Sequence, residues 1–170
     1  MCISVRAWIV SAMTMFASAA PAVAGQAMAF KSTGFFQVLA EGEITPDTPA
    51  AFTDYLNRNG PVHLTLMFNS PGGNLMAGLA LGREIRRAGW STNIGTSGLS
   101  PLVSNPGECD SACTLAFLGG RIRSMAFGSK YGVHRFWGQM AGDVQQSTPQ
   151  LAGELVAYIR EMGVSARCIH

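Results

Sequence analysis

Apolar positions in the first half of the chain follow two spacings, one typical of strands and one typical of helices. The run 62–68 is short, apolar and β-branched, and it predicts a strand in a buried sheet. In the segment 50–60 apolar residues recur at helical spacing, and Gly60 stands where a helix would end. The apolar run 34–39 predicts another strand before that helix. The pattern therefore begins with a strand, a helix and a second strand.

The same alternation continues through the middle of the chain. Residues 74–89 place leucines on one face and arginines on the other, which predicts an amphipathic helix that Gly89 closes. A brief strand is expected over 90–95. The segment 96–107 is rich in Gly, Pro, Ser and Asn, and it is expected to be a loop. After this loop, the apolar segment 112–118 predicts a buried helix.

Two strand-like runs and a long helix complete the pattern. The runs lie at 122–127 and 131–134. In the helix, Thr148 is the expected cap, Pro149 suits the first helical position, and Gly163 marks the end. Because strands alternate with helices, we expect an α/β layered fold with a mainly parallel sheet.

Length and composition limit the number of domains and the classes of partner. The chain has 170 residues, of which 48% are hydrophobic and 13% charged, enough for one core of ordinary size and no second one. The formal net charge is +2, and the one dense basic cluster lies in the helix expected at 74–89. Nucleic-acid binding therefore has little support. The sequence contains no G-x-x-x-x-G-K-[ST] loop, so we expect no use of ATP.

The amino-terminal residues have the layout of a secretory signal. An early arginine precedes an apolar stretch over 7–20, and small residues after it predict cleavage before Gly25. The alternative is an uncleaved membrane anchor, but a proline follows a stretch shorter than the roughly 20 residues that span a bilayer. We expect residues 1–24 to be a signal peptide and 25–170 to be a single exported domain, periplasmic or secreted.

Export changes the interpretation of the cysteines. Cys2 would leave with the signal, so Cys109, Cys113 and Cys168 remain, and the odd count leaves one thiol free or bonded between chains. The spacing of Cys109 and Cys113 permits a disulfide if a helix begins between them. Two buried free thiols are the alternative, and both stay open. A zinc site lacks the ligand set it needs, and we expect no metal and no other cofactor.

Two short segments carry residues suited to acyl-transfer chemistry. The sequence N-S-P-G-G at 69–73 ends a predicted buried strand, where ligands enter open α/β sheets and glycines let the backbone approach a substrate. The helix start after it offers unpaired N–H groups to an oxyanion, although a tight turn without a ligand explains the same residues. Ser111 opens a predicted helix with its hydroxyl accessible. Capping by Ser111 or by Asp110 is the simpler explanation when the serine is taken alone.

A serine nucleophile at neutral pH needs a base within hydrogen-bond reach. His134 follows the serine on a neighbouring strand-like run, whereas His63 alternates within its own strand and His170 is the last residue. A single histidine near a strand end is more often structural. His134 is nevertheless the candidate base.

Taken in order, these segments resemble the Clp protease proteolytic subunit and its exported relatives in the Clp/crotonase superfamily. The resemblance rests on the S-P-G-G turn, the Ser-Ala-Cys start of a buried helix and the segment G-S-x-x-G-V-H, and it covers residues 35–136. It implies a ClpP/crotonase-like layered fold in which Ser111 is the nucleophile and His134 the base. It also implies that Gly73 and Ala112 supply the N–H groups of an oxyanion hole.

The family pattern is incomplete at the carboxyl end. In the family an aspartate completes the triad, well beyond the histidine and past a helix like the one expected to end near Gly163. This chain ends before that position, so we expect a C-terminally truncated copy of the fold. Asp143 is the nearest carboxylate after His134, and nothing in its sequence setting marks it as the orienting acid. Loss of that acid can lower a rate on the order of ten-thousandfold while leaving residual activity.

Two further interpretations follow from the same resemblance. Some peptidases of the superfamily use a Ser–Lys pair, which would make Lys130 the base, although a lysine on a G-S-K turn would have to be desolvated to be neutral. The crotonase branch binds acyl-coenzyme A, which an exported protein rarely meets.

We expect an exported serine hydrolase acting on peptide or protein substrates, with a homo-oligomer implied by the resemblance. The competing hypothesis is a catalytically inactive binding or assembly module, so whether the chain is an enzyme stays open.

Overall fold

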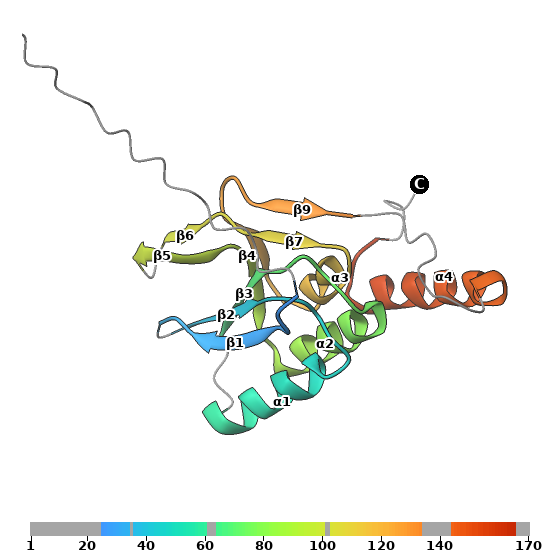
Figure 1. Ribbon diagram of the computed structural model, residues 1–170, viewed down its shortest axis with the longest axis horizontal. Helices are drawn as coiled ribbons and strands as arrows, with labels where there is room; N and C mark the ends of the chain where they lie inside the picture. Colours follow the sequence, from blue (N-terminus) through green and yellow to red (C-terminus); the bar gives the residue numbers. More distant parts are fainter. Residues whose placement is uncertain (1–24, 35, 61–63, 101–102, 134–143, 166–170) are drawn as a thin grey trace, which may run out of the picture.

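The computed structural model describes the chain beyond its amino-terminal segment (Figure 1). The described residues are 25–34, 36–60, 64–100, 103–133 and 144–165. The expected signal peptide at 1–24 lies outside them, as do His134, Asp143 and Cys168. None of the helices in these described ranges has both the length and the apolar character needed to cross a bilayer.

A five-stranded sheet forms the centre of the fold. Its strands, in spatial order, are β1 (Ala29–Ser32), β2 (Gln37–Glu41), β3 (Thr65–Asn69), β4 (Ser91–Ile94) and β8 (Arg123–Met125). Every neighbouring pair is parallel except β1 and β2. The α/β fold with a mainly parallel sheet is confirmed. The edge strand β1 was not predicted, because it is mostly exposed and shows no apolar alternation.

The described part of the chain has four helices. They are α1 (Thr48–Asn59), α2 (Leu75–Ala88), α3 (Ala112–Leu118) and α4 (Val144–Glu161). Gly60 and Gly89 end α1 and α2 as expected, and Gly89 has a φ of 75°, which glycine adopts without a steric penalty. The start expected for α4 at Thr148 was wrong, because the preceding glutamines favour a helix and extend it toward the amino terminus. Pro149 therefore lies inside α4.

Both faces of the central sheet are covered. The helices α1, α2 and α3 pack on one face (Figure 1), where Leu66 and Phe68 of β3 belong to the main apolar core. Met67 between them faces the other way and is also fully buried. Its sulfur accepts a hydrogen bond from the Ser104 hydroxyl at 3.6 Å. A strand that is apolar on both faces is typical of a parallel sheet covered on both sides.

The cover on the second face is a β-hairpin. It consists of β5 (Thr96–Ser100) and β6 (Val103–Asn105), which pair in the antiparallel direction. The segment 96–107 was expected to be a loop, and that expectation was wrong. Its polar, glycine-containing sequence shows no strand alternation, and its strands are defined by their pairing with each other.

A small second sheet extends from the carboxyl end of β3. It pairs β7 (Glu108–Asp110) with β9 (Lys130–Gly132) in parallel. Ser70, directly after β3, pairs with the middle of β7: its N–H donates to the Glu108 carbonyl at 2.8 Å, and its own carbonyl accepts from the Asp110 N–H at 3.1 Å. These bonds place the end of β7, and the residue after it, at the edge where open parallel sheets bind ligands.

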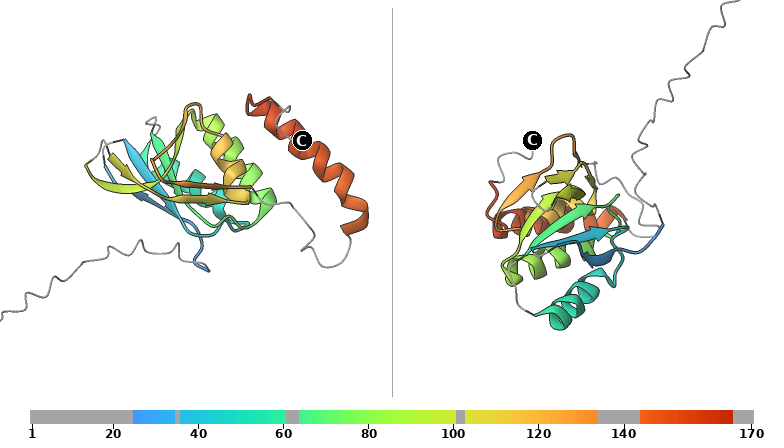
Figure 2. Two further views of the ribbon diagram at one scale, coloured as in Figure 1. Left: turned by 90° about the horizontal axis from the view of Figure 1, so that it is seen from above. Right: turned by 90° about the vertical axis from the view of Figure 1, so that its left-hand side faces the viewer.

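Glycines allow α3 to pack closely against α2. A Cβ atom at Gly78 would lie 2.6 Å from the Ala112 carbonyl oxygen, and one at Gly82 would lie 3.1 Å from that of Leu115. The helix α4 packs beside these two helices, on the side away from the sheet (Figure 2). There the Tyr158 hydroxyl donates a hydrogen bond to the Leu115 carbonyl at 2.7 Å. The helix α3 is therefore enclosed by the sheet and by two other helices.

Candidate functional site

Ser111 has an unusual backbone conformation at the junction of β7 and α3. Its φ is 54° and its ψ is −124°, and no other non-glycine residue in the described ranges has a positive φ. Such a conformation costs a residue with a side chain on the order of 1–3 kcal/mol, so the surrounding structure must hold it in place. The side chain is half-buried and makes no capping hydrogen bond to α3. Capping by Ser111 therefore does not explain this serine.

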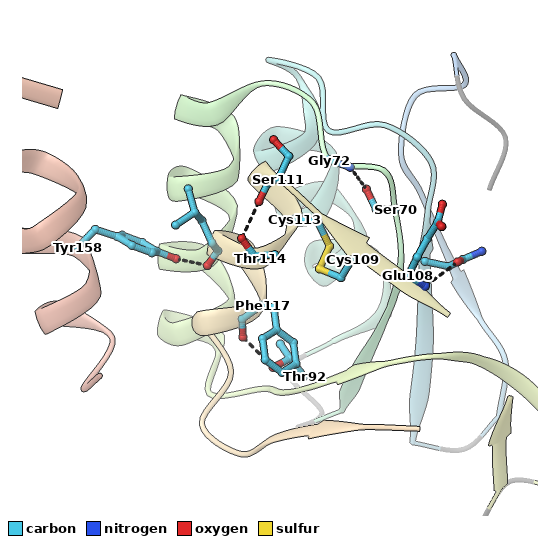
Figure 3. The surroundings of a disulfide bond; sticks show 12 residues. Ser70, Gly72, Thr92, Glu108, Cys109, Ser111, Cys113, Thr114, Phe117 and Tyr158 are labelled. Atoms are coloured by element: carbon cyan, nitrogen blue, oxygen red, sulfur yellow. Dashed lines mark hydrogen bonds between the residues drawn. A yellow bond between two sulfur atoms is a disulfide. The ribbon is translucent and has the colours of Figure 1, made fainter. Parts of the chain in front are cut away.

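Hydrogen bonds on both sides fix the main chain of Ser111. Its N–H donates to the Gly132 carbonyl of β9 at 2.8 Å. Its carbonyl accepts from the Thr114 N–H at 3.0 Å and from the Thr114 hydroxyl at 2.6 Å. In Figure 3 the Ser111 hydroxyl points away from Thr114 and from the neighbouring disulfide. The backbone is thus anchored to a strand and to a helix, while the hydroxyl has no hydrogen-bond partner among the described residues.

The glycine turn after β3 lies directly against Ser111. A Cβ atom at Gly72 would lie 2.8 Å from the Ser111 Cβ and 2.4 Å from the Asp110 carbonyl oxygen. The φ of Gly72 is 97°, so a residue with a side chain would be strained there even without these contacts. No role of its own was predicted for Gly72. The structure brings the S-P-G-G turn and Ser111 together, although about forty residues separate them along the chain.

Two main-chain amides beside Ser111 are unpaired within the described ranges: those of Gly73 and Ala112. Ile44 forms hydrogen bonds with the residues on either side of Gly73. The Ile44 N–H donates to the Gly72 carbonyl, and the Ile44 carbonyl accepts from the Asn74 N–H, both at 2.7 Å. In a parallel pair this register turns the Gly73 N–H to the opposite edge, where β7 lies. The Ala112 N–H is the first of α3, where intrahelical acceptors are lacking.

The register of β9 against β7 places the candidate bases relative to Ser111. Gly132 lies opposite Asp110 and accepts the Ser111 N–H, and His134 follows two residues later, outside the described residues. Lys130 lies opposite Glu108, at the far end of β7 from Ser111, and its side chain is exposed. Along this register Lys130 is therefore farther from Ser111 than Gly132 is.

Cys109 and Cys113 form a disulfide that spans Ser111 (Figure 3). Their Cα atoms are 5.2 Å apart, and both residues are fully buried. Cys109 lies in the middle of β7 and Cys113 in the first turn of α3, so the bond connects the strand before the serine to the helix after it.

Tyr131 of β9, which is 40% exposed, packs its ring against Phe117 near the end of α3. Its ring lies 5.8 Å from that of Phe117 in an edge-on arrangement. Burial raises the pKa of Tyr131 above its usual range, against the opposing effect of a side-chain hydrogen bond with Thr114. Because Thr114 also donates to the Ser111 carbonyl, these residues connect β9 to the serine through α3. The sequence analysis did not single out Tyr131 or Thr114. No group of three or more potential metal ligands occurs in the described part of the chain.

No family model matches the sequence, and no curated protein matches it. Solved structures do match the fold. One is the membrane-bound, stomatin-specific protease 1510-N in a serine-to-alanine form, with a TM-score of 0.50 and 21% identity, over 75% of this chain and 60% of that one. Another is the catalytic domain of the ClpP protease from Plasmodium falciparum, with a TM-score of 0.51 and 17% identity, over 73% of this chain and 64% of that one. The chain has a ClpP-like fold.

The ClpP-like fold accounts for the order of elements that the sequence predicted. The chain spans 60% and 64% of the lengths of these two structures. At the identities found, the likeness concerns the fold, and the chemistry of this chain has to be argued from its own residues.

Proposed function

We propose that this ClpP-like chain is an exported serine hydrolase that cleaves peptide bonds. Ser111 attacks the carbonyl carbon, His134 takes the hydroxyl proton, and the Gly73 and Ala112 amides stabilise the oxyanion. The observation that carries the proposal is the strained conformation of Ser111 beside two unpaired amides.

The surroundings of Ser111 suit a nucleophile better than a structural serine. A serine on a sharp strand-to-helix turn, with its hydroxyl free of structural bonds, is the arrangement that several hydrolases use to present the nucleophile to substrate. Strain of this kind at a single residue is frequent at active sites. Ser111 is half-buried, so the residue keeps some exposure to solvent.

The two amides suit an oxyanion because they belong to rigid elements. The Gly73 amide is held by the pairing of its neighbours with Ile44, and the Ala112 amide begins a helix buried under α2. Fixed N–H donors need no reorganisation when negative charge develops, which makes them effective in catalysis. The start of α3 adds a positive end of a helix dipole next to the same position.

His134 is the base that the strand register favours. It follows Gly132 by two residues, and Gly132 accepts the Ser111 N–H. Because β7 and β9 run parallel, the chain leaves Gly132 in the direction in which β7 leads to Ser111, whereas Lys130 precedes Gly132. Lys130 is the weaker alternative, because it pairs with the opposite end of β7 and is exposed.

Peptide substrates and an exported location have separate support. The two solved structures named above are described as proteases, which favours a peptide bond as the target. The signal-like segment 1–24 favours export, and a buried disulfide is typical of proteins outside the reducing cytosol. A Ser–His pair without an orienting acid would have a rate well below that of a full triad.

Fluorophosphonate labelling of the mature chain tests this proposal. We expect covalent modification of Ser111, located by peptide mass analysis, and a labelling rate at least ~1000-fold lower in Ser111→Ala and in His134→Ala. Ser32→Ala, which changes an exposed serine of β1, and His170→Ala are the matched controls and should label normally.

The same assay separates the proposal from its rival. A folded protein that reacts at no serine would contradict the hydrolase and favour a binding or assembly module. Labelling that survives in His134→Ala and is lost in Lys130→Ala would replace the Ser–His pair with a Ser–Lys pair.

A further inference from the structure

We propose that the Cys109–Cys113 disulfide positions the nucleophile, so that the chain is competent for hydrolysis only after this bond has formed. This inference rests on the proposed function of Ser111. It assigns to a buried, covalent link a role in activity as well as in stability.

The Ser111 backbone has a conformation that other contacts have to maintain. Ser111 has a φ of 54°, which an L-residue adopts only when its neighbours force it to. Released from these restraints, the residue would relax to an ordinary negative φ. The following peptide unit carries the Ala112 N–H, so the same relaxation would turn one of the two proposed oxyanion donors.

Apart from the disulfide, the Ser111 main chain is held by its hydrogen bonds to Gly132 and Thr114, and no hydrogen bond between described residues joins β7 directly to α3. The strand β7 has only three residues, held by hydrogen bonds to Ser70 and to β9. The helix α3 has seven residues, and its first turn has neither a side-chain cap from Ser111 nor an acidic residue. Thr114 ties the Ser111 carbonyl to the helix but makes no link to β7.

The disulfide connects β7 to α3 across the serine. It closes a ring from residue 109 to residue 113 with Ser111 at its centre, and it crosses beneath the turn on the side opposite the hydroxyl (Figure 3). Both cysteines are fully buried in the main core, beside Ala112 and Ala116. The bond therefore restrains the chain without blocking access to the serine.

A consequence concerns where the chain is active. Cys109 and Cys113 would give up two protons and two electrons by thiol–disulfide exchange with an oxidised protein disulfide of the receiving compartment. Before export both thiols would be kept reduced, and Ser111 would not be held for attack. A peptidase that acquires its active geometry only outside the cytosol spares the proteins of the cell that makes it.

The test compares the full mature chain with and without the bond, both carrying Cys168→Ser to remove the third thiol. We expect Cys109→Ala/Cys113→Ala to lower the fluorophosphonate labelling rate at Ser111 about a hundredfold, the scale of a misplaced reacting group. The Cα and Cβ chemical shifts of Ser111 should move toward values typical of a negative φ.

Circular dichroism and thermal unfolding show whether the variant is folded at the assay temperature. If the alanine pair does not fold, Cys109→Val/Cys113→Ala restores apolar volume and is measured in the same way. A folded variant with the original rate and original Ser111 shifts overturns the inference. If the oxidised protein itself shows no reaction at Ser111, the proposed function fails, and the chemical shifts alone still decide whether the disulfide holds the serine.

Discussion

At the scale of single residues, the strained serine is the feature that distinguishes this site from an ordinary helix start. The sequence supplied the candidates Ser111, His134, Gly73 and Ala112, because motif order along the chain restricts which residues can meet. It could not supply the φ of Ser111, since that angle depends on hydrogen bonds to Gly132 and Thr114 from other elements. Taken alone, Ser111 was predicted to be a helix cap, but its side chain makes no capping hydrogen bond.

The glycine turn should be intolerant of any side chain. In Gly73→Ala the new Cβ would lie 2.2 Å from the Ile44 carbonyl oxygen, at a φ of 133° that only glycine adopts readily. We expect a loss of about 2–4 kcal/mol in the free energy of unfolding, measured with urea, and a loss of labelling at Ser111. Gly34→Ala is the control, because nothing lies within 4 Å of its Cβ position and its φ is ordinary. Equal stability of the two variants would contradict the arrangement of the turn.

At the scale of elements, the close contact of α2, α3 and α4 supports the helix that carries the site. The alternation of strands and helices could be predicted from periodicity, and α2 and α3 lie within the segments predicted to be helical. The hairpin of β5 and β6 and the pairing of β7 with β9 were not readable, because short polar strands are defined by their partners rather than by their own sequence.

The helix contact should resist added volume at one glycine of α2. In Gly82→Ala the Cβ would lie 1.8 Å from the Tyr158 hydroxyl, which would have to leave the Leu115 carbonyl. We expect a loss of about 1–3 kcal/mol in the free energy of unfolding. Gly153→Ala in α4, where no atom lies within 4 Å, should instead stabilise the protein by about 0.5–1 kcal/mol. If both changes have the same effect, α4 does not pack as described.

The contact between α4 and α3 should also depend on pH. Burial raises the pKa of Tyr158 well above its usual range, against the opposing effect of the Arg83 guanidinium, which lies 5.3 Å from the ring centre. The neutral hydroxyl is therefore favoured in the folded state. The contribution of this neutral hydroxyl to the free energy of unfolding is complete below the unfolded pKa of about 10. It is lost progressively as the pH rises from there toward the higher folded-state pKa.

Urea unfolding at pH 8 and at pH 11 measures this contribution. Both proteins carry Cys168→Ser, which prevents disulfide exchange. Between these pH values the free energy of unfolding should fall more for the protein that keeps Tyr158 than for Tyr158→Phe. At pH 8 we expect Tyr158→Phe to be less stable by about 1–2 kcal/mol, through loss of the bond to Leu115. Parallel pH profiles for the two proteins would show that Tyr158 is not buried in its neutral form.

At the scale of the whole molecule, one sheet with helices on one face and a hairpin on the other presents the site at a single edge. The fold class followed from the sequence because an alternation of strands and helices has few solutions in one domain of this size. The signal peptide at 1–24 and the homo-oligomer stay predictions, the first from the sequence and the second from the resemblance.

Export can be measured on the intact chain. We expect material recovered from outside the cytosol to begin at Gly25, with a mass that also shows one disulfide and one remaining thiol. A cytosolic form should retain residues 1–24 and three reducible or free thiols beyond Cys2. Recovery of the full-length chain in a membrane fraction would contradict cleavage and favour the anchor.

The most direct measurement of the central claim is a crystal structure of the mature chain after reaction with a fluorophosphonate. The account predicts phosphorus bonded to the Ser111 oxygen, with the phosphonyl oxygen about 2.7–3.1 Å from the nitrogens of Gly73 and Ala112 and the His134 ring on the serine side of the site. A phosphonyl oxygen that contacts neither amide, or a His134 ring on the far side of β9, would contradict it.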